Sequence, residues 1–158
     1  MSERAHPATL WLSDDGFEVI AEREGCRLQA YLDSRGILTI GIGHTSAAGE
    51  PEVHEGMTIT QKQADEIFRR DAARFRQECL GLVKVPVHQH EFDALASFIF
   101  NLGATQFRNS TALKRLNNRD YEGCAEAMLW WDKPPEIRSR RRGEVEQFRH
   151  ARYESRIT

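Results

Sequence analysis

Hydrophobic residues recur with the period of a helix along most of this chain, and one stretch departs from that period. Apolar residues at helical spacing predict six helices, over residues 14–24, 61–80, 89–103, 111–118, 121–131 and 136–153. Residues 28–32 and 38–42 instead predict two short strands, and Ser34-Arg35-Gly36 between them suits a tight turn. The pattern therefore predicts an α+β fold in which one β-hairpin follows the first helix.

Polar residues and glycine mark several ends of these helices. Ser13 can cap the first helix, and Gly25 can adopt the left-handed conformation that closes it. Thr60 and Gln63 form the pattern of a capping box at the start of the second helix. Ser110 can cap a later helix in the same way. These signals support the predicted boundaries independently of hydrophobicity.

The loop after the second strand, SAAGEPEVHEGM, is longer than a tight connection requires. We expect a third short strand within it, near Val53–Gly56. Further along, the helix predicted over residues 89–103 carries apolar side chains on more than one face. It should therefore be the most buried helix of the second half of the chain.

The composition is that of an ordinary globular protein. Its 158 residues suffice for one domain, or for one domain divided into two lobes. The formal net charge is −2, with 29% charged and 40% hydrophobic residues, so overall charge does not indicate a polyanionic partner. Apolar runs are too short for a membrane span, and the first residues lack the apolar core of a signal peptide. We expect synthesis without a signal peptide and no stable membrane insertion.

Neither the cysteines nor the histidines form a known cofactor or catalytic pattern. Cys26, Cys79 and Cys124 are widely separated and lack the spacing of a metal site, and we expect reduced, partly buried thiols. The histidines are not arranged around a serine or cysteine nucleophile. We therefore expect chemistry that needs no metal and no cofactor.

The C-terminal part of the chain is rich in arginine. The residues are Arg138, Arg140, Arg141, Arg142, Arg149, Arg152 and Arg156. Because glutamates are interspersed with them, we expect a solvated helix surface with offset charges. Attraction to an anionic cell wall is the alternative. Nucleic-acid binding is not indicated, because no nucleic-acid motif accompanies the arginines.

The stretch from Glu24 to Thr45 carries the most distinctive chemistry. Glu24 ends the first helix, Asp33 precedes the turn of the hairpin, and Thr39 lies on the second strand. A hairpin returns the chain on itself, so these three side chains can face one cleft. Cleavage of a glycosidic bond needs one carboxylic acid to protonate the leaving oxygen and one carboxylate to attack or to position water. A helix-end charge and a turn residue are the alternative, and the spacing alone does not decide.

This stretch, EGCRLQAYLDSRGILTIGIGHT, follows a longer pattern, E-G-x-R-L-x-A-Y-x-D-x-x-G-x-x-T-I-G-x-G-H-T. With this pattern the chain resembles the phage-type lysozymes, or endolysins. The resemblance continues through GMTITQKQADEIF, HEFDALASFIFNLG, NSTALKRLN and RSRRRGEVEQF, and spans about residues 13–150. It implies muramidase activity in host lysis, with cleavage of the β-1,4 bond between N-acetylmuramic acid and N-acetylglucosamine in peptidoglycan.

The resemblance also implies a two-lobed fold with a substrate cleft between the lobes. An α+β lobe over residues 13–60 and a helical lobe over residues 81–158 are expected to be joined by a long helix, residues 61–80. Residues 1–12 are expected to pack as an N-terminal arm. The implied partner is the glycan strand of peptidoglycan, and we expect a monomer. Release from the host cytoplasm by a holin, followed by action in the periplasm, is the expected route.

The family's catalytic roles fall on three residues of this chain. By the resemblance, Glu24 is the general acid, and Asp33 and Thr39 orient the attacking water. A hydroxyl that positions water favours inversion of the anomeric configuration. The carboxyl groups of Glu24 and Asp33 should then lie about 6.5–9.5 Å apart, whereas about 5–5.5 Å would favour a covalent route.

The resemblance places further substrate contacts at four positions. Thr45 is expected at the edge of the groove, and Phe100, Asn101 and Ser110 are expected to contact the glycan. For Phe100 a place in the core remains open. Asn101 can instead bond main chain near the catalytic acid, and Ser110 can serve only as a helix cap.

Three residues are expected to support the site without contacting substrate. Arg27 can pair with a carboxylate of the second lobe, because its guanidinium stays charged and cannot transfer a proton. His44 is expected to pair with Asp71, since relatives carry an acidic residue at the matching place. This pair would fasten the hairpin to the long helix.

Two other functions remain open from the sequence. A lytic transglycosylase needs a catalytic acid but no water-orienting pair, so the presence of Asp33 and Thr39 counts against it. A non-catalytic peptidoglycan-binding or tail-associated module would be favoured by the loss of a catalytic residue. None of the three is lost.

Overall fold

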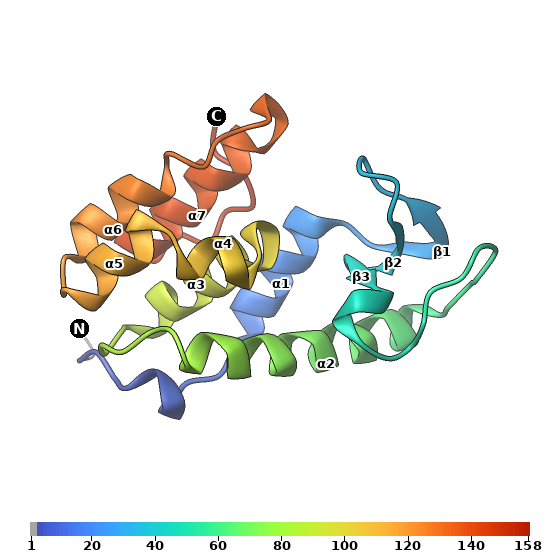
Figure 1. Ribbon diagram of the computed structural model, residues 1–158, viewed down its shortest axis with the longest axis horizontal. Helices are drawn as coiled ribbons and strands as arrows, with labels where there is room; N and C mark the ends of the chain where they lie inside the picture. Colours follow the sequence, from blue (N-terminus) through green and yellow to red (C-terminus); the bar gives the residue numbers. More distant parts are fainter. Residues whose placement is uncertain (1–2) are drawn as a thin grey trace. The chain divides into compact units, whose positions relative to one another are not determined.

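The structure is a computed structural model that describes residues 3–158 (Figure 1). Within these residues the helices are α1 (Asp14–Glu24), α2 (Gln61–Leu80), α3 (Gln89–Leu102), α4 (Ala104–Arg108), α5 (Thr111–Asn117), α6 (Tyr121–Met128) and α7 (Arg138–His150). The strands are β1 (Arg27–Leu32), β2 (Leu38–Gly41) and β3 (His44–Thr45). Single 3₁₀ turns lie at Pro7–Thr9, Ser46–Ala48 and Pro135–Ile137. The predicted α+β class is confirmed.

The chain divides into two compact units. One consists of Met1–Ile20 together with Phe75–Thr158, and the other is Ala21–Arg74. Both divisions fall inside helices, because α1 and α2 each contribute residues to both units. The first unit is almost entirely helical, and the second contains the sheet. The lobe boundaries expected from the sequence, near residues 60 and 81, stay predictions.

A small antiparallel sheet with the order β1-β2-β3 organises the unit Ala21–Arg74. Tyr31 pairs with Thr39 across the hairpin, and Thr39 pairs with Thr45 on the other side. The prediction of a third strand near Val53–Gly56 was wrong, because the third strand is β3 at His44–Thr45. Gly43, with φ 68°, reverses the chain directly after β2, so that His44 returns against Ile40.

The helix predicted to be most buried, α3, forms the centre of the larger unit. Phe98 and Ile99 on α3 are almost fully buried, and the helix packs against α7, as Figure 1 shows. Helices α5 and α6 pack against each other, and α6 also contacts α7. Gly103 ends α3 with φ 94°, as the sequence indicated.

Several predicted helix boundaries are confirmed, and the later ones need correction. Helix α1 has the expected limits, and Ser13 caps it by accepting from the Gly16 N–H at 3.0 Å. The capping box of α2 is also present, since Thr60 and Gln63 exchange hydrogen bonds of 2.8 and 3.1 Å. Helices α6 and α7 are shorter than predicted, and α4 was not predicted. Pro135 starts a separate 3₁₀ turn that delays the start of α7.

The cysteines differ in exposure. Cys79 and Cys124 are buried free thiols, as expected, and burial raises the pKa of each to about 12. The expectation of partial burial was wrong for Cys26, which is exposed because it directly follows the glycine that ends α1. Among residues 3–158, no helix combines the length and the apolar character that crossing a bilayer requires.

Candidate active site

Glu24 is the last residue of α1. The next residue, Gly25, has φ 73° and donates its N–H to the Ala21 carbonyl at 2.8 Å, which closes the helix. Glu24 is half-buried. The end of the helix fixes its main chain through local structure.

Asp33 organises the turn between β1 and β2. Its Oδ1 atom accepts the main-chain N–H of Arg35 at 2.8 Å and of Ile37 at 2.9 Å. Its own N–H donates to the Ile37 carbonyl at 3.0 Å. The Ile37 N–H, followed by the N–H and charge of Arg35, holds the pKa of Asp33 below its usual value despite some desolvation. Asp33 is therefore held as a carboxylate in a fixed orientation.

Thr39, like Asp33, is hydrogen-bonded to Ile37. It is only 4% exposed, and its Oγ1 donates to the Ile37 carbonyl at 3.0 Å. Asp33 and Thr39 are thus both bonded to the main chain of Ile37, with Asp33 directly after β1 and Thr39 on β2. We call Asp33, Ile37 and Thr39 the hairpin cluster.

The two acceptors of the hairpin cluster keep bonding capacity. The hydrogen of the Thr39 hydroxyl is used by Ile37, so toward any further partner this oxygen can only accept. Within residues 3–158, no hydrogen bond reaches the Oδ2 atom of Asp33. One anionic and one neutral oxygen acceptor are therefore available in the hairpin cluster.

His44 and Asp71 form a buried pair in the same unit. The Nδ1 atom of His44 lies 2.7 Å from Asp71 Oδ2, and its Nε2 atom lies 2.8 Å from the Pro51 carbonyl. A carboxylate and a carbonyl can only accept, so both ring nitrogens are favoured in the protonated form. Burial lowers the pKa of His44, but the bonds to Asp71 and Pro51 outweigh it and the net shift is upward. The predicted contact is present, and it connects β3 with α2.

Arg27 and Thr45 lie on the strands that flank the hairpin cluster. Arg27 is exposed, and its guanidinium carbon lies 4.2 Å from the centre of the Tyr31 ring. That distance is typical of a cation–π contact. Thr45 is half-buried and is the direct cross-strand partner of Thr39.

The other expected substrate residues belong to the larger unit. Phe100 is half-buried, with its ring 6.0 Å from that of Phe75. Ser110 is 6% exposed and caps α5, since its Oγ donates to the Phe107 carbonyl and accepts from the Leu113 N–H. Asn101 is exposed at the end of α3. The capping role of Ser110 is confirmed, and the sugar contacts of all three stay predictions.

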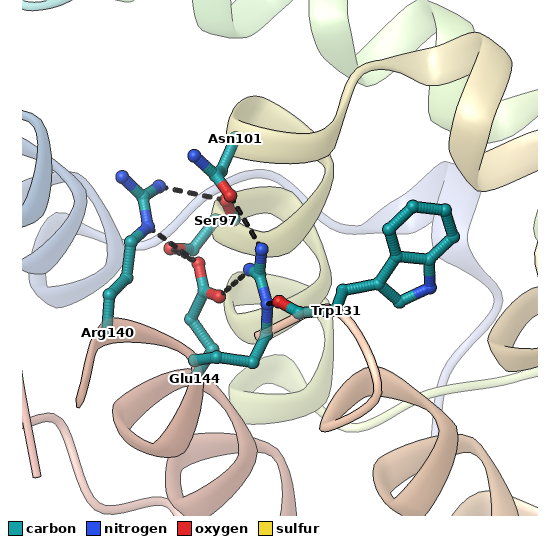
Figure 2. Close-up of polar contacts among 6 residues, drawn as sticks. Ser97, Asn101, Trp131, Arg140 and Glu144 are labelled. Atoms are coloured by element: carbon teal, nitrogen blue, oxygen red, sulfur yellow. Dashed lines mark hydrogen bonds and ion pairs between the residues drawn. The ribbon is translucent and has the colours of Figure 1, made fainter. Parts of the chain in front are cut away.

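A largely buried polar network, which the sequence did not predict, connects α3 with α7. Figure 2 shows the side chains of Ser97, Asn101, Arg140 and Glu144 together with Trp131. Arg141 forms hydrogen bonds with Trp131, Glu144 and Asn101. We call Ser97, Asn101, Arg140, Arg141 and Glu144 the arginine cluster. The expectation of a solvated surface was wrong for its members on α7, because they face α3 and are at most 5% exposed. The doublet Arg140-Arg141 followed by Glu144 on one helical face was the available signal.

Among residues 3–158, no group of three or more histidine, cysteine, aspartate or glutamate side chains could hold a metal ion. The groups that the arrangement offers for chemistry are carboxylates and hydroxyls. Glu24 can carry a proton, and Asp33 with Thr39 can accept hydrogens from a small polar molecule. These capacities are the ones that glycosidic hydrolysis requires.

Comparisons with known proteins identify relatives across most of the chain. The family model of phage lysozyme matches residues 21–145. The endolysin of Salmonella phage P22 is 42% identical over 141 residues, which cover 87% of this chain and 97% of that protein.

Solved structures show a similar fold. The endolysin from Escherichia coli O157:H7 phage FAHEc1 has a TM-score of 0.83 and 38% identity, covering 94% of this chain and 98% of that one. A P22 lysozyme mutant has a TM-score of 0.77 and 40% identity, covering 89% and 99%. With the family model and these relatives in agreement, the chain belongs to the phage lysozyme family and is a muramidase, a glycoside hydrolase of host lysis.

Proposed function

We propose that Glu24, Asp33 and Thr39 are the catalytic residues of this muramidase. Glu24 protonates the oxygen that leaves, and Asp33 and Thr39 orient a water that attacks the anomeric carbon from the other side of the sugar. The bond cleaved is the β-1,4 link between N-acetylmuramic acid and N-acetylglucosamine. The configuration at the anomeric carbon is inverted, because water and not a carboxylate forms the new bond.

The hairpin cluster carries this proposal. A water that donates one hydrogen to Asp33 Oδ2 and the other to Thr39 Oγ1 has both hydrogens engaged. Its remaining lone pairs then point away from the hairpin, where the sugar carbon must lie. The Thr39 hydroxyl supports this role because its own hydrogen is already given to Ile37.

Asp33 has two tasks in this mechanism. It takes a proton from the water as the new bond forms, and its charge stabilises the positive charge that develops on the sugar. Both tasks need the ionised form, which the lowered pKa of Asp33 favours. The turn holds Oδ1, so that only Oδ2 is directed to the reaction.

The remaining site residues are proposed to bind or to support. Thr45 lies beside Thr39 at the edge of the site, and Phe100 and Ser110 contact the glycan from the larger unit. The exposed amide of Asn101 is a further contact. Arg27 supports the site, and the His44–Asp71 pair holds β3 against α2.

Product analysis on purified peptidoglycan tests the catalytic assignment. The intact protein should release fragments with new reducing ends, and Glu24→Gln should release about 10²–10⁴-fold fewer per unit time. Glu22→Gln, an exposed neighbour on the same helix, is the matched control and should match the intact protein. Anhydro products from the intact protein would instead identify a transglycosylase. Binding without products from either protein would identify a wall-binding module.

A separate experiment determines whether the anomeric configuration is inverted or retained. The first product formed from soluble glycan chains should be the α-anomer at the new reducing end, observed by proton NMR before mutarotation. A β-anomer would mean that the configuration is retained, with Asp33 as the nucleophile.

We also propose that the protein acts as a monomer on peptidoglycan in the periplasm, after a holin releases it from the cytoplasm. The route is supported by relatives that are phage endolysins. Expression with and without a co-expressed holin tests it, since lysis should begin only when the holin is present. Lysis that starts at the same time without any holin would contradict it.

A further inference from the structure

We propose that Arg141 is a positioning residue for substrate binding. It holds the side-chain amide of Asn101 so that the Nδ2 group donates a hydrogen bond to an acetamido carbonyl oxygen of the bound glycan. The inference rests on the proposed function, in which Asn101 contacts the glycan. Neither the sequence pattern nor the comparisons assign a role to Arg141.

The partner of Asn101 fixes which way its amide faces. Arg141 Nη2 donates to Asn101 Oδ1 at 2.6 Å. A guanidinium has five N–H donors and no acceptor, so the oxygen of the amide must face it. The two Nδ2 hydrogens then face the other way. Since Asn101 is exposed, they are directed to the surface of the protein.

Arg141 is itself held immobile, which is the property a positioning residue needs. It is 0% exposed, its Nε donates to the Trp131 carbonyl at 2.8 Å, and its Nη1 donates to Glu144 Oε1. The guanidinium carbon lies 4.7 Å from the centre of the Phe98 ring. The three donor groups of the guanidinium therefore each have a different partner, and only one of them is Asn101.

Glu144, which binds Arg141, is itself held by buried contacts. Its second oxygen, Oε2, accepts from Ser97 Oγ at 2.5 Å and from Arg140 Nε at 3.2 Å. The carboxylate is 0% exposed and is bound to both arginines. The orientation of Asn101 is thus set by a chain of buried contacts that begins on α3, runs through α7 and returns to α3.

The chemistry of Nδ2 defines the ligand group. A fixed, neutral N–H donor has its best partner in a group that can only accept. Peptidoglycan presents such a group on every sugar, the carbonyl oxygen of the acetamido substituent. A sugar hydroxyl differs, because it can donate as well as accept and could be bound equally well by an oxygen at this position.

A double-mutant cycle tests the proposal through KM and kcat on soluble glycan chains. Asn101→Ala should raise KM about tenfold, the cost of one lost hydrogen bond of this kind, and leave kcat within about twofold. Arg141→Lys should also raise KM severalfold, because a lysine cannot reproduce the forked geometry. In the double variant KM should be no higher than in Asn101→Ala alone, since Arg141 acts through Asn101. Arg142→Lys, the exposed neighbour, is the control and should leave both constants unchanged.

Asn101→Asp identifies the ligand group. An aspartate keeps the contact with Arg141 but offers oxygen in place of the N–H, so KM should rise at least as much as in Asn101→Ala. An unchanged KM would mean that a hydroxyl is bound, and the assignment of the acetamido carbonyl would be wrong. A rise in KM for Arg141→Lys that is just as large in the Asn101→Ala background would show a purely structural effect and overturn the positioning role.

NMR covers the case in which Arg141→Lys does not fold. In the Glu24→Gln variant, which should bind without turnover, soluble glycan chains should shift the Nδ2 hydrogens of Asn101. Resonances that stay unchanged at saturation would overturn the proposal. Failure of the proposed function is distinguishable, because it would appear as undiminished turnover by Glu24→Gln, whatever the KM of the Asn101 variants.

Discussion

The hairpin cluster and the arginine cluster both fix polar side chains with short hydrogen bonds, but they differ in what they leave available. In the hairpin cluster, one oxygen of Asp33 and the lone pairs of Thr39 remain for another molecule. In the arginine cluster, both oxygens of Glu144 are engaged by buried partners. The carboxylate of Asp33 can therefore bind another molecule, whereas the carboxylate of Glu144 can only hold its neighbours in place.

The two clusters differ in solvent exposure, and this difference explains how each can contain a charged carboxylate. Asp33 is partly exposed and is bonded to main-chain N–H groups of its own turn, so its charge stays solvated. Glu144 is fully buried, where an unpaired charge is very unfavourable and a paired one is strongly held. A charge that must react is therefore kept near water, and a charge that must orient others is kept away from it.

The largest loss of stability is expected from Glu144→Gln. The change leaves Arg140 and Arg141 buried without the carboxylate that lies between them, because glutamine is neutral and has an NH₂ donor in place of one carboxylate oxygen. Breaking a buried ion pair from one side typically costs about 3–5 kcal/mol. Urea unfolding followed by circular dichroism measures the change.

A matched control for this variant lies on the same helix. Glu146→Gln removes a charge that is half-exposed, and its unfolding free energy should stay within about 0.5 kcal/mol of the intact protein. Equal losses for the two variants would mean that the arginine cluster contributes nothing specific. The contrast between the two regions would then have no energetic basis.

An intermediate effect is expected at the His44–Asp71 pair, which is buried like the arginine cluster but lies in the unit of the hairpin cluster. Asp71→Asn removes the charge that favours protonated His44, and His44 can respond by losing its proton. The cost is therefore limited to about 1.5–3 kcal/mol, the range for a hydrogen bond with a charged partner.

This loss should depend on pH in a defined direction. The folded-state pKa of His44 is raised above its unfolded value of about 6.5, so the stabilisation is complete below that pH and disappears as pH rises through the raised pKa. The intact protein and Asp71→Asn should accordingly differ most in acid and converge in base. Glu66→Gln, exposed on the same helix, controls for the change in net charge. A difference that grows with pH would contradict the assignment of a charged His44.

The hairpin cluster could be predicted from sequence because it is local. Glu24 follows from a helix that ends at a glycine, and Asp33 and Thr39 follow from a turn of fixed length between two strands. Every contact in this cluster joins residues at most four apart in the chain. Residue type and spacing therefore determine the geometry almost by themselves.

The arginine cluster and the third strand show why the rest could not be predicted. Glu144 accepts from Ser97, 47 residues away, and no periodicity within one helix reveals which face will meet another helix. Charged residues usually mark a solvated face, and here tertiary pairing overrides that tendency. At β3, two residues suffice for a strand only because Ile40 lies opposite, which again depends on a partner that the local pattern does not contain.

The smallest change in stability, combined with a large change in activity, is expected from Asp33→Asn. The asparagine oxygen can still accept the N–H groups of Arg35 and Ile37, so the turn should survive and the urea midpoint should stay close to that of the intact protein. The other position changes from an anionic acceptor to an N–H₂ donor. Activity on peptidoglycan should fall about 10²–10⁴-fold, as expected for loss of a catalytic base.

Acid pH should also remove the charge of Asp33, because it protonates the carboxylate. Because the main-chain N–H of Ile37 lowers the pKa of Asp33, the intact protein should keep the ionised form of this residue to below pH ~3.9, the ordinary value of an aspartate. The acid limb of kcat should therefore lie below that pH for as long as the protein stays folded, and Asp33→Asn should lack it. If Asp33→Asn unfolded as easily as Glu144→Gln, the turn would depend on the charge itself. The charge of Asp33 would then stabilise the fold, as the charge of Glu144 does. The proposed distinction between a reacting carboxylate at Asp33 and a structural carboxylate at Glu144 would be wrong.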